Sequence, residues 1–408
     1  MVVVERLKAT SGFYKNYVKK FYEDAHRAKA EKRPVAWVAS TFPVETLQAM
    51  DIVPVWPENY ASVCAARQLS VELCERAERE GFSRDLCSYS RCVLGSMFGY
   101  EKDLPEGGLP KPDFLVTTTC ACDTHLKWFQ VASRLYNVPL FLLDVPYNIG
   151  GGDSDHLDKA HIDYYASQLN ELFAFLEKQT GTKLDLDRLR ETLAISNWTS
   201  KLWLEIQGYR KSVPCPMDAR DAFSAVFFML CIPGSQLAVD YYTQLRDEVR
   251  QRAKDGVGVI DNERFRLVWD NLPLWFNLKI FDYLNSLGAV VVAEVFSHTW
   301  AGNLDPSKPF ESLARKYLPN MANSNIQRRI DIIVNLVKDF HVNGVVLPTN
   351  WGCRMMSIGE TIVRDAVYKK LGVPSLIIDV DSSDWRVAGE AQVKERLATF
   401  VETLRGYS

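Results

Sequence analysis

The residues in this sequence with the clearest capacity for chemistry are its cysteines. The chain has nine cysteines among 408 residues, and most of them crowd into its first third. None forms the Cys-x-x-Cys pair that structural zinc sites favour. Soft thiolates drawn from separate loops suit an iron–sulfur cluster better. A free cysteine also serves as a small buried apolar residue, so residue type alone leaves both interpretations open.

Local sequence divides the cysteines into two groups. Packing is the better interpretation where the surroundings are apolar and helix-like or where prolines flank a lone cysteine, which describes Cys74, Cys215 and Cys231. Cys122 and Cys353 instead follow strand-like apolar runs. For these two, and for Cys87, the pattern alone favours neither packing nor a cluster.

The surroundings of Cys122 and Cys353 resemble each other. Cys122 lies in a polar loop between an apolar run at 114–116 and a helix-like segment, and a second run follows at 139–144. In the C-terminal part, residues 342–350 lead to Cys353, a helical pattern and a last run at 373–379. We interpret this as a weak internal duplication. Open α/β sheets carry their chemistry at the carboxyl ends of strands, so two such units facing each other would bring Cys122 and Cys353 into one cleft.

Strand-like and helix-like segments alternate, which predicts an α/β fold of two lobes with mainly parallel sheets flanked by helices. We predict a helical arm over 1–32, a first lobe over 33–155, a helical segment over 156–263 and a second lobe over 264–408. Aromatic residues four apart in the arm predict a face that packs on another lobe or a partner. Gly150-Gly151-Gly152 is interpreted as a flexible linker between the first lobe and the helical segment.

The predicted strands are short apolar runs bounded by turn residues. They are 35–38, 51–56, 114–116 and 139–144 in the first lobe, and 289–296, 344–347 and 376–379 in the second.

Composition excludes several classes of partner. The net charge of −3 gives no reason to expect nucleic acid or an anionic membrane. The most apolar segment, 223–233, is too short to span a bilayer and is interpreted as a buried helix. The first residues lack the apolar core of a signal peptide, so we expect a cytoplasmic protein with reduced cysteines. The sequence contains no phosphate-binding or dinucleotide-binding glycine motif, so it shows no site of its own for ATP or a nicotinamide cofactor.

Short motifs in a fixed order give a more specific indication. They are Arg33-Pro34-Val35, Phe42-Pro43, Pro57-Glu58-Asn59, Glu72-Leu73-Cys74-Glu75, Asp85-Leu86-Cys87, Pro112-Asp113-Phe114-Leu115, Cys122 before Lys127-Trp128, Leu184 to Arg190, Tyr241-Tyr242, Ser297 to Ala301, and Cys353. In order and spacing this set resembles the 2-hydroxyacyl-CoA dehydratase/benzoyl-CoA reductase family over nearly the whole chain. The resemblance is closest to the larger, substrate-binding subunits.

The resemblance implies a [4Fe–4S] cluster held by Cys87, Cys122 and Cys353, with one iron open to water or a substrate oxygen. It also implies a separate ATP-hydrolysing iron–sulfur activator that delivers a low-potential electron, which agrees with the missing ATP motif. The substrate would be an acyl-CoA thioester, dehydrated through a ketyl radical, or an aryl-CoA whose ring is reduced. A homologous smaller subunit or a second copy of the chain would complete the enzyme.

Four further residues have suggested roles. Ser40 and Glu58 match family positions that line the substrate site, where Glu58 would hold or move a proton; read alone, Ser40 suits a helix cap. His125 is either a donor to a cluster sulfur or a surface histidine on the first turn of a helix. His298 and Trp300 line the acyl pocket or simply pack at a strand end.

The chain departs from the dehydratase pattern at three further cysteines. Cys64, Cys92 and Cys120 lie beside the expected ligand segments. Some members of the wider family carry a double-cubane [8Fe–9S] cluster on six cysteines and reduce small molecules without CoA. The surrounding motifs favour a single cluster acting on an acyl-CoA. A subunit that only relays electrons is the alternative from another class.

Overall fold

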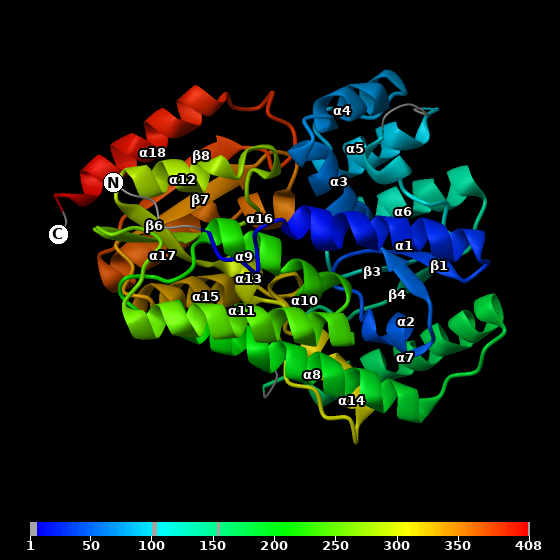
Figure 1. Cartoon of the computed structure of the whole chain (residues 1–408). Coiled ribbons are helices and arrows are strands. Elements are labelled where there is room, and N and C mark those ends of the chain that lie inside the picture. The colour runs from blue at the N-terminus through cyan, green and yellow to red at the C-terminus, as the bar shows by residue number, and fades with distance from the viewer. Residues whose placement is uncertain (1–5, 100–103, 152, 154–155, 407–408) are drawn as a thin grey trace.

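The computed structural model describes residues 6–99, 104–151, 153 and 156–406. Its strands are β1 (Val35–Val38), β2 (Val53–Val55), β3 (Phe114–Thr118), β4 (Leu140–Leu143), β5 (Phe265–Trp269), β6 (Ala289–Glu294), β7 (Gly344–Asn350) and β8 (Ser375–Val380). They form two four-stranded, all-parallel sheets, which confirms the predicted α/β class (Figure 1).

Helices flank both sheets (Figure 1). In the first half they are α1 (Lys19–Ala30) after a π-helical turn (Tyr14–Val18), α2 (Glu45–Ala49), α3 (Pro57–Ala66), α4 (Ser70–Arg79), α5 (Ser88–Met97) and α6 (Asp123–Tyr136). The middle of the chain contributes α7 (Lys159–Thr180), α8 (Leu186–Tyr209), α9 (Ala219–Ala225), α10 (Phe227–Cys231) and α11 (Gln236–Asp255). The last part contributes α12 (Lys279–Ser286), α13 (Val295–His298), α14 (Pro309–Tyr317), α15 (Ile326–Asp339), α16 (Arg354–Ser357), α17 (Glu360–Leu371) and α18 (Glu390–Leu404).

The two sheets share one topology. Their strand orders are β2-β1-β3-β4 and β6-β5-β7-β8, so β5 to β8 repeat the arrangement of β1 to β4. Each sheet buries a tryptophan completely in the first strand of its half, Trp37 in β1 and Trp269 in β5. Strands β1, β3, β5 and β6 are buried along their whole length, as expected for parallel strands with helices on both faces. The shared order agrees with the internal duplication inferred from sequence.

Strand β5 corrects the prediction of only three strands in the second lobe. A buried arginine, Arg266, interrupts its apolar run and hid the strand signal. The guanidinium donates to the carbonyl oxygens of Phe340 (2.6 Å) and Ser212 (3.0 Å) and pairs with Glu263. These contacts satisfy a charge that would otherwise be too costly to bury in the sheet.

The N-terminal arm packs on the middle of the chain. Phe13 and Tyr17 lie edge-on to the ring of Phe228, and Phe21 lies edge-on to Phe227. The predicted helix over 1–32 is shorter, because its regular part begins at Tyr14, and residues 1–5 lie outside the described residues. The predicted packing on another part of the chain agrees with these contacts.

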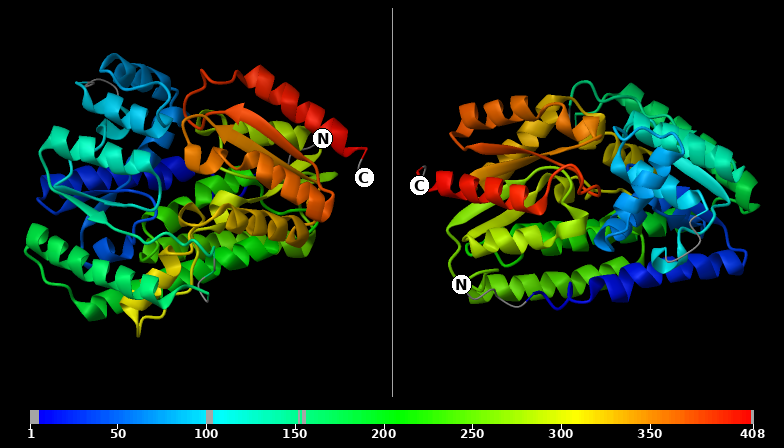
Figure 2. Two further views of the ribbon diagram at one scale, coloured as in Figure 1. Left: turned by 180° about the vertical axis from the view of Figure 1, so that it is seen from behind. Right: turned by 90° about the horizontal axis from the view of Figure 1, so that it is seen from above.

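The middle helices bridge the two halves. Figure 2 shows long green helices that run alongside both halves, and the yellow helix α14 packs on α7. Helix α8 packs on α2 and on α11, while α9 packs on β6. Whether 156–263 is a unit of its own stays a prediction, and Gly152 and 154–155 of the predicted linker lie outside the described residues. No helix in the described ranges is long and apolar enough to cross a bilayer.

The contact between α4 and α5 yields a stability prediction. A Cβ at Gly95 in α5 would lie only 1.8 Å from the carbonyl oxygen of Leu73 in α4. We expect Gly95→Ala to force the helices apart and lower the free energy of unfolding by about 1–3 kcal/mol. Gly208 in α8 has open space around it, so Gly208→Ala is the control and should leave stability equal or higher. Urea denaturation measures both, and equal stability of the two variants would contradict the close packing.

Candidate functional site

A cavity of about 460 Å³ lies where the carboxyl ends of both sheets meet. Its lining includes residues just after four strands: Ser40 after β1, Asn271 after β5, Trp351 after β7 and Ser382 after β8. Parallel α/β sheets place their ligands at this edge. The cavity is therefore where the fold predicts chemistry.

Three cysteines from distant segments line this cavity. Cys87, Cys122 and Cys353 each immediately precede a helix, α5, α6 and α16 respectively. The Sγ of Cys122 also accepts the backbone N–H of His125 at 3.4 Å. A helix N-terminus favours a thiolate over a thiol. The predicted meeting of Cys122 and Cys353 in one cleft agrees with this arrangement.

A close backbone approach joins the segments of Cys87 and Cys353. Gly352 has φ +75°, and a Cβ there would lie 2.8 Å from the carbonyl oxygen of Leu86 and 3.0 Å from the backbone nitrogen of Cys87. Only glycine meets both requirements without strain. The loop after β7 is therefore seated directly against the segment that carries Cys87.

The three thiols also share an electrostatic environment. Burial raises the pKa of Cys87 to about 11 and that of Cys353 to about 12, and negative charge on the neighbouring cysteines adds to both effects. For Cys122, burial works in the same direction, but the adjacent His125 outweighs it and lowers the pKa. Three thiolates in a desolvated cavity repel one another, so the deprotonated set requires a bound cationic centre.

A carboxylate and an imidazole form a pair beside Cys122. The Oε1 of Glu58 in α3 lies 2.8 Å from the Nε2 of His125 and accepts the backbone N–H of Ser40 at 2.8 Å. Burial opposes a charged imidazole, but Cys122 and Glu58 together raise the pKa of His125 well above its usual value. The Oε2 of Glu58 is buried and has no hydrogen-bond partner among the described residues. The Nδ1 of His125 is unpartnered among these residues as well, so each member of the pair has one polar atom left available to a ligand.

The positions of Ser40, His125, His298 and Trp300 bear on the roles suggested for them from sequence. Ser40 is not a helix cap, because α2 begins at Glu45 with Val44 before it. His125 lies on the first turn of α6, but its side chain is only 15% exposed and its ring contacts Glu58. Trp300 lines the cavity. His298 does not: it bonds the carbonyl of Glu294 at 2.8 Å, and burial lowers its pKa to about 4, so packing is its role.

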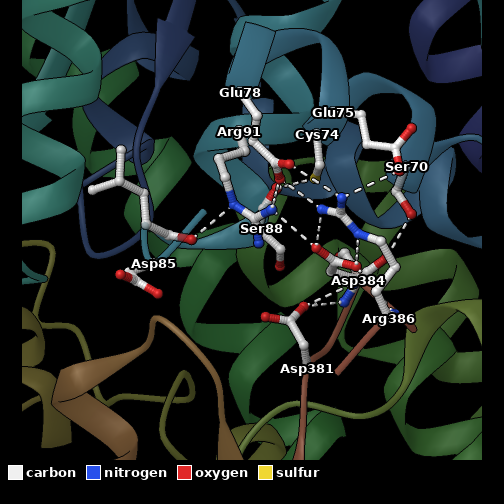
Figure 3. Close-up of polar contacts among 12 residues, drawn as sticks. Ser70, Cys74, Glu75, Glu78, Asp85, Ser88, Arg91, Asp381, Asp384 and Arg386 are labelled. Atoms are coloured by element: carbon white, nitrogen blue, oxygen red, sulfur yellow. Dashed lines mark hydrogen bonds and ion pairs between the residues drawn. The ribbon is translucent and has the colours of Figure 1, made fainter. Parts of the chain in front are cut away.

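A buried ion network fixes the segment before Cys87 (Figure 3). Arg91 in α5 donates to the carbonyl oxygen of Leu86 (2.9 Å), to Glu78 (2.6 Å) and to Asp384 (2.9 Å). Arg386 donates to Glu78 (2.6 Å) and to Asp384 (2.8 Å). The network, defined as Glu78, Arg91, Asp384 and Arg386, ties α4 and α5 of the first half to the loop after β8. Sequence reasoning missed it, because single charged residues hundreds of positions apart give no local signal.

Comparison with known proteins agrees with this site. Residues 39–404 match the family described as 2-hydroxyglutaryl-CoA dehydratase, D-component. The chain belongs to this family. Among the relatives, the (R)-2-hydroxyisocaproyl-CoA dehydratase alpha subunit of Clostridioides difficile is 29% identical, covering 94% of this chain and 93% of that protein. The (R)-phenyllactyl-CoA dehydratase alpha subunit of Clostridium sporogenes is 29% identical over 93% and 92%. A benzoyl-CoA reductase subunit of Thauera aromatica is 30% identical over 88% and 85%.

These relatives confirm the resemblance recognised from the motifs. The dehydratase family contains enzymes, and this chain is an enzyme of that family. Because the relatives are named as single subunits of larger enzymes, such chains work in assemblies with other subunits.

The dehydratase family implies an iron–sulfur cluster, and the donor set of the cavity fits one. In the described part of the chain, no group of three or more His, Cys, Asp or Glu side chains is gathered to hold a single metal ion. A cubane differs, because each thiolate binds a different iron and the thiolates are spread around it. Cys87, Cys122 and Cys353 line one cavity and come from three separate segments of the chain, as the ligands of a cubane would.

The three additional cysteines do not line the cavity. Cys64 and Cys92 are fully buried next to each other between α3 and α5. Cys120 bonds the hydroxyls of Thr41 (3.2 Å) and Thr118 (3.3 Å). None of the three lines the cavity. The structure therefore brings together the set of Cys87, Cys122 and Cys353 and leaves the second set divided between two places.

Proposed function

We propose that this chain is the cluster-bearing, substrate-binding subunit of an enzyme that dehydrates a 2-hydroxyacyl-CoA thioester. An ATP-hydrolysing iron–sulfur activator would supply the electron. The observation that carries the proposal is the convergence of Cys87, Cys122 and Cys353 on a cavity that also contains the Glu58–His125 pair.

In this proposal the three cysteines hold a [4Fe–4S] cluster, which supplies a low-potential electron and a Lewis-acidic iron to the thioester. The protein supplies position and protonation. Glu58 presents its unpartnered Oε2 to the substrate and holds or moves a proton there. His125 orients Glu58 through its Nε2, and the backbone N–H of Ser40 fixes the same oxygen. The apolar lining excludes water from the reacting atoms.

A single cubane is favoured over the double-cubane [8Fe–9S] alternative. That alternative would need Cys64, Cys92 and Cys120 to reach the same centre, and none of the three lines the cavity. Reduction of an aryl-CoA ring is the second candidate reaction, because the similarity to a benzoyl-CoA reductase is as high as that to the dehydratases. We further propose that a homologous smaller subunit, or a second copy of this chain, completes the assembly, since the relatives are named as subunits.

Anaerobic purification with metal analysis tests the proposal. About four irons and four sulfides per chain are expected for one cubane, against about eight irons for the double cubane. Activator-dependent loss of the 2-hydroxyl group from an acyl-CoA ester is the expected reaction. A preparation without iron would refute the proposed function.

The role of Glu58 gives a separate prediction. Glu58→Gln keeps the size of the side chain but removes its negative charge, so we expect turnover to fall about 10²–10⁴-fold with the iron content unchanged. Glu395 on α18 is exposed and serves for the control Glu395→Gln, which should turn over like the unaltered enzyme. Turnover of the Glu58 variant at the unaltered rate would remove this residue from the mechanism.

A further inference from the structure

One wall of the cavity is a chain of aromatic rings. The ring centroids of Phe223 and Trp275 lie 6.0 Å apart, those of Phe223 and Phe296 lie 6.3 Å apart, and those of Phe296 and Trp300 lie 5.5 Å apart. All four residues line the cavity. They come from α9, the segment after β5, α13 and the turn after it, and together we call them the aromatic wall. Only Trp300 was expected at the pocket from sequence.

The aromatic wall starts beside the reactive residues. The indole N–H of Trp275 donates to the hydroxyl of Tyr89, which is two residues after Cys87. The same hydroxyl lies 3.3 Å from the Oγ of Ser62, one helical turn after Glu58. A ligand whose thioester lies near Cys87 and Glu58 would therefore extend its acyl side chain along the wall.

The cavity offers little to a second negative charge on the ligand. Among the described residues, its lining cations other than His125 are Arg6 and Arg354. Arg6 already bonds the carboxylate of Asp221, with its Nε at 3.0 Å. Arg354 lies at the rim, where its side chain is 80% exposed and 3.9 Å from Asp123. Neither presents an uncompensated charge to the interior.

Two amide side chains of the lining hold its loops in place. Asn271 donates to the carbonyl oxygen of Pro348 at 2.9 Å and accepts the backbone N–H of Leu272. Asn350 accepts the backbone N–H of Ser382 at 2.9 Å. These amides hold the loops around the cavity. Among the described residues, the buried lining donors left without a partner, besides the Nδ1 of His125, are the indole N–H groups of Trp128 and Trp300, which carry no charge.

Resting on the proposed function, we propose that the acyl group of the substrate carries an aromatic ring and not a second carboxylate. A ring laid against the aromatic wall gains edge and face contacts as well as burial of its apolar surface. A side-chain carboxylate in the same place loses its hydration without gaining a cation. The site therefore selects an aryl-substituted 2-hydroxyacyl-CoA over a dicarboxylic one.

Three CoA esters test this proposal on the anaerobically purified enzyme with its activator. Phenyllactyl-CoA has the aromatic side chain, 2-hydroxyglutaryl-CoA the carboxylate, and lactoyl-CoA only a methyl group. We expect kcat/KM for phenyllactyl-CoA to exceed that for 2-hydroxyglutaryl-CoA at least about 100-fold. Calorimetric titration without the activator should show the same order of affinities, independently of turnover.

A variant of the wall separates specific contacts from general damage. Trp300→Ala should lower the ratio of kcat/KM for phenyllactyl-CoA to that for lactoyl-CoA about tenfold, because the methyl group does not reach the wall. Trp198 on α8 is 48% exposed and lies outside the cavity, so Trp198→Ala should leave the ratio unchanged. Preference for 2-hydroxyglutaryl-CoA, or an unchanged ratio in Trp300→Ala, would overturn the aromatic substrate while leaving the proposed function standing. Absence of binding and turnover with all three esters would instead refute the proposed function, and the substrate class with it.

Discussion

Replacing Cys122 by alanine is expected to remove essentially all cluster iron from the anaerobically purified protein. Cys122 is the thiol whose pKa the adjacent His125 lowers against the effect of burial, so it is the readiest thiolate of the three. Two buried thiols with raised pKa values, Cys87 and Cys353, remain and cannot hold a cubane alone. Iron and sulfide analysis, with electron paramagnetic resonance of the reduced protein, measures the result.

The control for this experiment lies two residues away. Cys120 is in the same loop but does not line the cavity, and its thiol bonds Thr41 and Thr118, so Cys120→Ala should keep about four irons per chain. Full iron in Cys122→Ala would refute its assignment as a ligand. Loss of half of about eight irons in Cys120→Ala would instead establish the second cubane.

Replacing Asp384 by alanine is expected to destabilise the fold by about 3–5 kcal/mol, because it removes one of the two counter-ions of the buried Arg91 guanidinium, leaving Glu78, and also a partner of Arg386. Arg91 is 0% exposed and Asp384 is 1% exposed, so water cannot compensate either charge. The loss should appear as a lower free energy of unfolding in urea. Arg91 also holds the carbonyl of Leu86, so we expect the variant to bind its cluster less tightly.

The same carboxylate gives this effect a pH dependence. Burial opposes its charge, but hydrogen bonds from Arg386 and Arg91 outweigh burial and lower the pKa of Asp384. A lowered folded pKa contributes stability above the ordinary aspartate value and loses it as the pH falls through the folded value. The difference between the unaltered protein and Asp384→Ala should therefore be largest near neutral pH and shrink on acidification below the ordinary aspartate range.

A surface ion pair provides the control. Asp365 pairs with Arg364 at 2.8 Å, but the two side chains are 68% and 45% exposed. Asp365→Ala should change stability by less than about 1 kcal/mol. If Asp384→Ala were equally mild, the buried network would not be what holds the loop after β8 to α4 and α5.

Much of the fold follows from local sequence. Apolar runs such as 114–116 and 289–293 predict buried parallel strands, because a strand covered on both faces has no polar side. The repeated order of run, cysteine loop and helix predicted a weak internal duplication, and the shared topology of the sheets agrees with it. Strand Phe265–Trp269 was missed because the partners that satisfy Arg266 are distant in sequence.

The sequence by itself determined the α/β class, the family and the position of Cys122 and Cys353 at equivalent strand ends, because these depend on local periodicity and short motifs. Only the tertiary structure decided which thiols meet, that Glu58 faces His125, and that aromatic rings from three segments form one wall. The reason is physical: contacts between distant residues, and their desolvation, depend on how the two sheets face each other. No local pattern along the chain encodes the relative placement of the sheets.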